Sequence, residues 1–193
     1  MSTSDLSLTG TGVEMLPAPG GARWRSCLWD YLTIVAWIAV VTGAGLLLRS
    51  WWPVDVSSAS LLLTDTVAFG STVLPVWIYL TLCEAGARQA PWGKRLAGLR
   101  VVATSTQVEV GFGRAALRNA VKLLPWQLAH LAVARLILSA DAPVLIATTY
   151  ALACAVPTVS LVVAWRDPHH RALHDFVANT RVVMARSPDP TTS

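Results

Sequence analysis

The chain has 193 residues, of which 54% are hydrophobic and only 13% are charged. A soluble protein of this size needs more charged side chains to cover its surface, so the composition excludes an ordinary soluble protein and indicates an integral membrane protein. The formal net charge of +4 could suit nucleic acid. The basic residues lie between apolar segments, however, as expected for membrane-protein loops that are retained on the cytoplasmic side. We therefore expect no nucleic-acid partner.

The two ends of the chain differ in composition from the middle. Residues 1–22 are rich in Ser, Thr, Gly and Pro and contain no long apolar run. We predict a disordered cytoplasmic tail over residues 1–22, a transmembrane domain over 23–184 and a second disordered tail over 185–193.

Three uncharged runs are long enough to cross a bilayer. Residues 31–48 and 66–83 contain 18 residues each, and residues 142–165 contain 24. Eighteen helical residues cover roughly 27 Å, close to the thickness of the hydrocarbon core. These runs predict spans at about residues 28–49, 63–84 and 142–165.

A fourth span at residues 122–140 is less apolar, because Arg135 interrupts it. As one helix, this segment would direct Arg135 outward or pair it with Asp141. The alternative is a re-entrant or interfacial segment, which would leave three spans.

The distribution of basic residues favours four spans. With four crossings and a cytoplasmic N-terminus, 13 of the 15 basic residues lie on the cytoplasmic side, and only Arg49 and Arg135 lie outside. We therefore expect several crossings with both termini in the cytoplasm. The excess of arginine over lysine and the abundant Ala and Val suggest a bacterial source, and hence a bacterial plasma (inner) membrane protein.

The cytoplasmic loop between the second and third spans predicts further structure. Residues 99–102, 107–110 and 180–184 read as short strands of a small ribbon. Residues 113–122 read as an amphipathic helix, whose stripe of Arg114, Arg118 and Lys122 suits an anionic inner leaflet. The expected fold is an all-α integral membrane protein, a four-helix transmembrane bundle with a small cytoplasmic β-ribbon.

Signatures of catalysis and of metal binding are weak. The sequence contains no GxSxG or HExxH motif, and we expect neither enzymatic activity nor a cofactor. His170 and His174, with Asp167 and Asp175 nearby, offer metal-ligating groups, but we interpret them as interfacial polar residues rather than as a metal site. His130 in the third span predicts either a proton relay or, preferably, a hydrogen bond to a neighbouring helix.

Asp30 lies at the inner end of the first span and needs a partner or a proton, because a lone buried carboxylate is costly. Arg23 precedes it by seven residues, about 10.5 Å along a helix, which is too far for direct pairing. The candidate partners are Arg118, Lys122 and Arg171. The alternative is a hydrated, interfacial Asp30 without a specific role.

Several blocks of the sequence, in this order, resemble the RDD family of bacterial membrane proteins, named for one arginine and two aspartates. Arg23 and Asp30 match its first arginine and aspartate, and the segment RALHD at residues 171–175 matches its second aspartate with Asp175. The segment PWGKRLAGLRVV at residues 91–102 resembles its TPGKrllGLrVV stretch. Arg118 matches its loop arginine. In this chain Trp92 interrupts the Pro-Gly pair, while Phe176 and Asn179 stand where arginine and glycine are usual.

The resemblance implies a membrane protein with a polar cluster at the inner helix ends. We expect the cluster to contain Arg23, Asp30, Arg118 and Asp175, with His174, Arg171, Lys94 and Arg95 as secondary members. The cluster either locks segments together or binds a cation or proton. The two leading functions are accordingly a membrane scaffold or assembly partner and, as the alternative, transport of a cation, proton or small solute through an oligomer. The expected partners are the lipid bilayer, further copies of the chain or another membrane protein.

Overall fold

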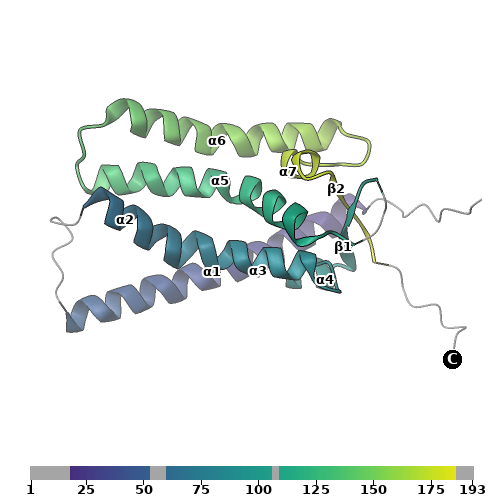
Figure 1. Cartoon of the computed structure of the whole chain (residues 1–193), viewed down its shortest axis with the longest axis horizontal. Coiled ribbons are helices and arrows are strands. Elements are labelled where there is room, and N and C mark those ends of the chain that lie inside the picture. Colours follow the sequence, from purple (N-terminus) through teal and green to yellow (C-terminus); the bar gives the residue numbers. More distant parts are fainter. Residues whose placement is uncertain (1–17, 53–59, 106–108, 186–193) are drawn as a thin grey trace, which may run out of the picture.

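The computed structural model describes residues 18–52, 60–105 and 109–185. Long helices run side by side, and two short helices and a two-stranded ribbon gather at one end (Figure 1). In chain order the elements are α1 (Gly20–Trp51), α2 (Leu61–Ala68), the π-helix η2 (Phe69–Val73), α3 (Leu74–Ala85), α4 (Trp92–Leu96), β1 (Leu99–Ala103), α5 (Phe112–Ile137), α6 (Pro143–Arg166), α7 (Leu173–Val177) and β2 (Thr180–Met184).

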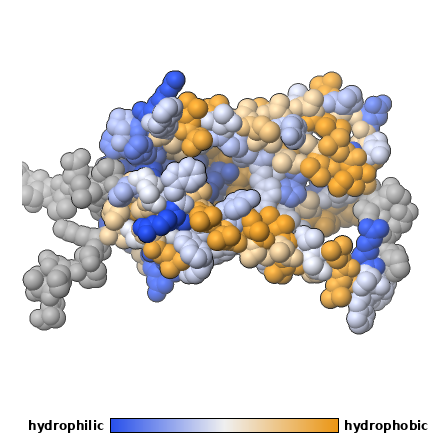
Figure 2. All heavy atoms as spheres, turned by 180° about the vertical axis from the view of Figure 1, so that it is seen from behind, coloured by the Kyte–Doolittle hydropathy of each residue, from blue (hydrophilic) through white to orange (hydrophobic). Residues whose placement is uncertain are grey.

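Three helices are long and apolar enough to cross a membrane: α1, the continuous α2–η2–α3 segment, and α6. They coincide with the three uncharged runs of the sequence. Their apolar side chains face outward, as with Leu46 at 65% exposure and Trp165 at 82%. Figure 2 shows hydrophobic residues, in orange, spread over the surface of the long helices. Lipid is the natural solvent for this surface.

The long helices do not pack equally. α5 lies between α3 and α6 and contacts both extensively, whereas α1 makes its main contact with the short helix α4 and a smaller one with η2. Figure 1 shows the C-terminal half of α1 diverging from α2. The long helices are therefore packed around α5, with α1 attached chiefly through α4.

The π-helix η2 interrupts the second apolar helix and exposes backbone carbonyls to new partners. Trp37 of α1 donates its indole N–H to the carbonyl of Ser71 at 3.0 Å. Thr72 lies 3.5 Å from His130 Nε2 of α5, so the predicted hydrogen bond between His130 and a neighbouring helix is present. A π-turn inside an α-helix thus brings α1, α2–α3 and α5 together at one level.

The ribbon pairs β1 with β2 in antiparallel register, from Leu99 opposite Met184 to Ala103 opposite Thr180. Two of the three predicted strands therefore exist and pair. Of the third, residues 107 and 108 lie outside the described residues, and Glu109 and Val110 belong to no strand. Leu99 and Val182 pack on Ala18 and Ala22, which attaches the ribbon to the start of α1.

Two predictions about charged side chains are wrong. The helix predicted at residues 113–122 is the first part of α5, but its Arg118 is only 2% exposed, so the three basic residues do not form one continuous stripe facing a lipid leaflet. Arg135 pairs with Asp65 of α2 rather than with Asp141, through two contacts of 2.8 Å. In both cases α5 turns its polar face toward neighbouring helices, because a charge there finds partners that lipid does not offer.

Candidate functional site

The end of the molecule that carries the ribbon encloses a network of buried charges. Its centre is Glu84, the penultimate residue of α3, which is fully buried. Glu84 Oε1 accepts hydrogen bonds from Arg118 Nη1 at 2.5 Å and from Lys94 Nζ at 3.1 Å. Glu84 Oε2 accepts one from Asn119 Nδ2 at 3.0 Å. One carboxylate therefore joins α3, α4 and α5.

Asp30 reaches this network through α4. Its Oδ2 lies 3.6 Å from Lys94 Nζ, and its Oδ1 accepts a hydrogen bond from the Gly93 N–H at 3.0 Å. The partner of Asp30 is thus Lys94, a residue expected only as a secondary member of the cluster. The partners expected first, Arg118, Lys122 and Arg171, make no direct contact with it in the described part of the chain.

Gly93 makes this approach possible because it has no side chain. A Cβ atom there would lie 2.5 Å from Asp30 Oδ1 and 2.7 Å from the carbonyl oxygen of Ser26. Side chains cannot approach so closely without displacing a neighbour. The glycine therefore lets α4 lie directly against α1 and places Lys94 between Asp30 and Glu84.

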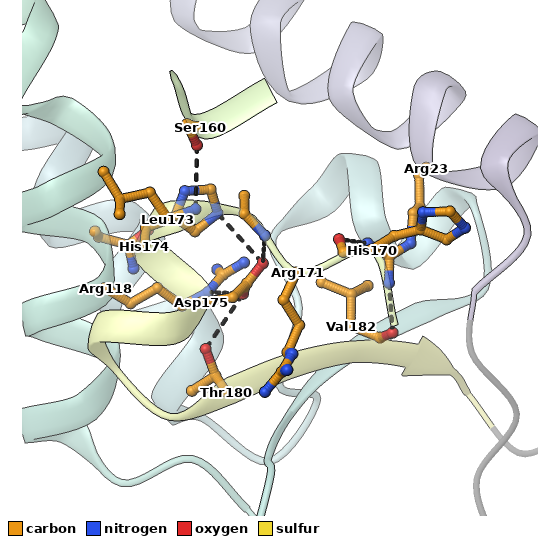
Figure 3. Close-up of polar contacts among 12 residues, drawn as sticks. Arg23, Arg118, Ser160, His170, Arg171, Leu173, His174, Asp175, Thr180 and Val182 are labelled. Atoms are coloured by element: carbon orange, nitrogen blue, oxygen red, sulfur yellow. Dashed lines mark hydrogen bonds and ion pairs between the residues drawn. The ribbon is translucent and has the colours of Figure 1, made fainter. Parts of the chain in front are cut away.

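Asp175 closes the other end of the network (Figure 3). Its Oδ1 accepts hydrogen bonds from Arg118 Nε at 3.0 Å and from Thr180 Oγ1 at 3.2 Å. Its Oδ2 accepts one from the Ala172 N–H at 3.1 Å and lies 3.7 Å from His174 Nε2. Burial alone would raise the pKa of Asp175, but Arg118 outweighs that effect and holds the pKa below its usual value. The carboxylate is therefore ionised.

His174 adjoins this carboxylate but remains neutral. Burial, reinforced by the nearby Arg118 cation, lowers the pKa of His174 to about 3. The charge of Asp175 acts in the opposite direction and is outweighed. The short helix that carries both residues is fixed to α6, because the Leu173 N–H donates to Ser160 Oγ at 3.2 Å.

Arg23 belongs to a separate set of contacts. Its guanidinium donates to four backbone carbonyls, those of Ala18 at 3.2 Å, His169 at 3.1 Å, His170 at 2.6 Å and Val182 at 3.0 Å. Among the described residues it makes no ion pair with a carboxylate. It ties the start of α1 to the segment before α7 and to β2, as Figure 3 shows for His170 and Val182.

Two other expected members lie outside the network. Arg171 forms an ion pair with Asp167 at 2.9 Å and stacks on the ring of Phe176, with its Cζ atom 4.1 Å from the ring centroid. The hydrogen bonds from Arg171 lower the pKa of Asp167 to about 2. Arg95 is exposed at the surface of α4.

Glu84 is absent from the predicted cluster, although its position at the inner end of a span is the same as that of Asp30. That shared position was the available signal. Asn119, the residue after the loop arginine, was overlooked as well.

The described residues contain no group of three His, Cys, Asp or Glu side chains that could hold a metal ion. His169 and His170 are exposed, and the carbonyls of both accept from Arg23. The carboxylates of the network face cations from the protein itself. The arrangement is therefore that of an internal salt-bridge network.

The model of the RDD family matches residues 19–179 of the chain. This match covers all four residues of the predicted cluster and all three described helices that are long and apolar enough to cross a membrane.

The chain belongs to the RDD family. It is a membrane protein with several apolar helices, and the resemblance noted in the sequence is confirmed. No curated protein and no solved structure matches it.

The backbone accounts for a departure of this RDD protein from the expected pattern. Asn179, which stands where glycine is usual, has φ of 51°, and asparagine tolerates this left-handed region better than most residues. It forms the turn between α7 and β2, so the exchange keeps Thr180 in reach of Asp175. Phe176, which replaces an arginine, supplies the ring on which Arg171 stacks.

Proposed function

We propose that this RDD-family chain is a membrane scaffold or assembly partner, and that its buried charges act as a structural lock. The observation that supports this proposal is the state of the three carboxylates. All six carboxylate oxygens of Asp30, Glu84 and Asp175 have a partner among the described residues. A transported cation would have to displace these partners from the carboxylate oxygens. A structural lock, by contrast, requires every carboxylate oxygen to be paired within the protein.

The charge balance supports the same role. Asp30, Glu84 and Asp175 face the cations Lys94 and Arg118, and Lys122 lies half-buried one turn further along α5. With Lys122 counted, three negative and three positive groups balance within this network. Removing one partner of a buried pair is strongly destabilising. Any arrangement of the segments that separates these pairs is therefore much higher in free energy than the observed one.

We further propose that α5 is a fourth crossing and that the protein is a four-helix, multi-pass protein of a bacterial plasma membrane. The 26 residues of α5 extend about 39 Å, enough to span the bilayer. The side chains that lower its hydropathy point at other helices, since Arg135 pairs with Asp65 and His130 faces Thr72. The excess of basic residues at the network end supports a cytoplasmic position for both termini.

The alternative, transport through an oligomer, receives less support from the interior. An apolar cluster of Val73, Val76, Leu80 and Leu123 lies along the helices between the Glu84 network and His130. No continuous polar route through one copy is visible in the described residues. We also expect no enzymatic activity, because the acids and bases of the network are engaged with one another, and no role in nucleic-acid binding.

Cross-linking in native membranes tests the scaffold. A photoreactive amino acid would replace Tyr150 or Leu161, which are 61% and 64% exposed on α6, and Leu46 of α1 would serve as a second face. We expect a discrete adduct with another membrane protein or with a second copy, formed from one face and not from the other. Adducts with lipid alone from both faces would overturn the proposal.

Reconstituted vesicles with an internal pH-sensitive dye separate the two functions. The scaffold proposal expects no cation-dependent dissipation of a pH gradient. Dissipation that the Asp30→Asn variant abolishes, while that variant stays folded, would instead establish transport.

A further inference from the structure

The short helix α4 has two distinct faces. Gly93 and Lys94 are buried against α1 and Glu84, as described above. Trp92 and Leu96, by contrast, are 45% and 55% exposed, and Arg95 is exposed beside them. Residues 92, 95 and 96 follow the helical spacing that places them on one side. The outward side of α4 therefore combines an indole, an aliphatic side chain and a cation.

A second indole extends this surface onto α1. Trp29, which is 40% exposed, meets Trp92 edge to face, with ring centroids 5.6 Å apart. The start of α4 is held in place, because the Trp92 N–H donates to the Tyr79 hydroxyl of α3 at 3.1 Å. Two half-exposed indoles from different helices are therefore fixed in one arrangement before any ligand binds.

The charge around the indoles is positive and unbalanced. Arg25 precedes Trp29 by one helical turn on the same side of α1 and is exposed, as is Arg95. In the part of the chain that the structure describes, the guanidinium group of neither arginine has a hydrogen-bond or ion-pair partner. The nearest carboxylates, Asp30 and Glu84, are buried and already paired.

The position of this surface along α1 defines its surroundings. Trp29 and Asp30 immediately precede the uncharged residues 31–48, so the surface lies where the helix enters its apolar run. Indole side chains prefer this level of a bilayer, where an apolar ring and a polar N–H are both accommodated. Phosphate groups of lipids lie at the same level.

We propose that the α1–α4 face, formed by Arg25, Trp29, Trp92, Arg95 and Leu96, binds the headgroup of an anionic phospholipid. The two guanidinium groups donate charge-assisted hydrogen bonds to the phosphate. The indoles lie against the glycerol region, and Leu96 contacts the first part of an acyl chain. The two positive charges favour a lipid with net negative charge over a zwitterionic one.

Quenching of tryptophan fluorescence tests the site. The full-length protein, held in zwitterionic lipid–detergent micelles, would be titrated with phosphatidylglycerol carrying brominated acyl chains. The test variant is R25Q/R95Q, and the matched control is R114Q/R166Q, which removes the same charge from exposed arginines of α5 and α6. We expect the test variant to weaken binding by roughly tenfold or more, since one basic residue contributes about a factor of five. The control should change it less than twofold.

A second variant locates the ligand. W29F/W92F should remove most of the saturable quenching, while W51F/W52F, at the other end of α1, should leave it intact. Equal weakening by both arginine variants, or saturable binding of brominated phosphatidylcholine with the same affinity, would overturn the proposal. Competition by soluble glycerophosphoglycerol as strong as that by the intact lipid would also overturn it, because the site would then recognise a free anion.

Discussion

Glu84 is the residue on which most of the buried charge depends. It accepts from Arg118, Lys94 and Asn119 at once, and these come from two different helices. Burial removes the water that would otherwise solvate both cations. Each cation is tolerated in the interior because this carboxylate, Asp30 or Asp175 lies beside it.

We expect Glu84→Gln to destabilise the protein strongly. The neutral amide can still hydrogen-bond but no longer compensates two buried cations, and breaking a buried ion pair costs about 3–5 kcal/mol. Thermal unfolding in detergent should show a midpoint lower by roughly 10 °C, given about 2–4 °C per kcal/mol for a chain of this size. Glu109→Gln, at an exposed position, is the control. A fall of under 2 °C in Glu84→Gln would contradict the lock.

His174 makes the stability depend on pH. Burial and Arg118 lower its pKa in the folded protein to about 3, from an ordinary 6.5, so the unfolded chain binds more protons between these values. The contribution of His174 is therefore complete above pH 6.5 and is lost as the pH falls toward 3. Asp175 adds a loss in the same direction below its own ordinary value of 3.8.

The corresponding measurement compares unfolding at pH 7 and pH 4.5. We expect the wild-type protein to lose about 2–3 kcal/mol more than His174→Asn over this interval, because asparagine does not titrate. His169→Asn changes an exposed histidine nearby and should behave like the wild type. Identical pH dependence in His174→Asn and the wild type would show that the histidine is not held neutral.

At the scale of elements, α4 is the connection between α1 and the rest of the molecule. Its five residues place Gly93 against Asp30 and Ser26, Lys94 between two carboxylates, and Trp92 against Trp29. Few contacts are available elsewhere along α1, whose C-terminal half is mostly exposed. The attachment of this 32-residue helix thus depends chiefly on one turn of another helix.

Gly93→Ala tests this attachment. The new Cβ atom would approach Asp30 and Ser26 to 2.5–2.7 Å, so α4 must move away from α1. We expect a loss of about 2 kcal/mol from overpacking and from the weakened Lys94–Asp30 pair. Gly113→Ala is the matched control, because its Cβ would meet no atom within 4 Å. In α5 an alanine should be neutral or slightly stabilising. Equal behaviour of the two variants in thermal unfolding would contradict the close approach.

At the scale of the whole molecule, polar side chains of α5 pair with polar side chains of the α2–α3 segment at three levels among the described residues. Arg118 meets Glu84, His130 meets Thr72, and Arg135 meets Asp65. The two helices run antiparallel, so these pairs hold one register from end to end. This register supports α5 as a crossing, since its charges are compensated inside the protein rather than by lipid.

Labelling of single cysteines decides whether α5 crosses the membrane. In a variant without native cysteines, Ser105→Cys precedes α5 and Ser139→Cys follows it, and both positions are exposed. We expect a membrane-impermeant thiol reagent to modify Ser139→Cys in intact cells, and Ser105→Cys only after the membrane is opened. Labelling of both from the same side would establish three crossings.

Much of the fold followed from the sequence, because the length of an uncharged run and the pattern of a strand are local properties. The helices α1, α2–α3 and α6 and the strands β1 and β2 occur where these patterns indicated. The order of short motifs identified the RDD family in the same way. Predicting these features does not require knowing which residues contact one another in the fold.

The pairing of charges was decided only by the tertiary structure. Hydropathy showed that Asp30, Arg118 and Asp175 lie near one end of the helices. Which charges pair there depends on how each helix is rotated about its axis and on the close contact between α4 and α1 that Gly93 allows. Glu84 therefore took the central place, Arg23 bound carbonyls instead of a carboxylate, and Arg135 turned to Asp65. The amino-acid sequence determined that this is a membrane protein of its family, and the packing of α4 and α5 determined which charges hold it together.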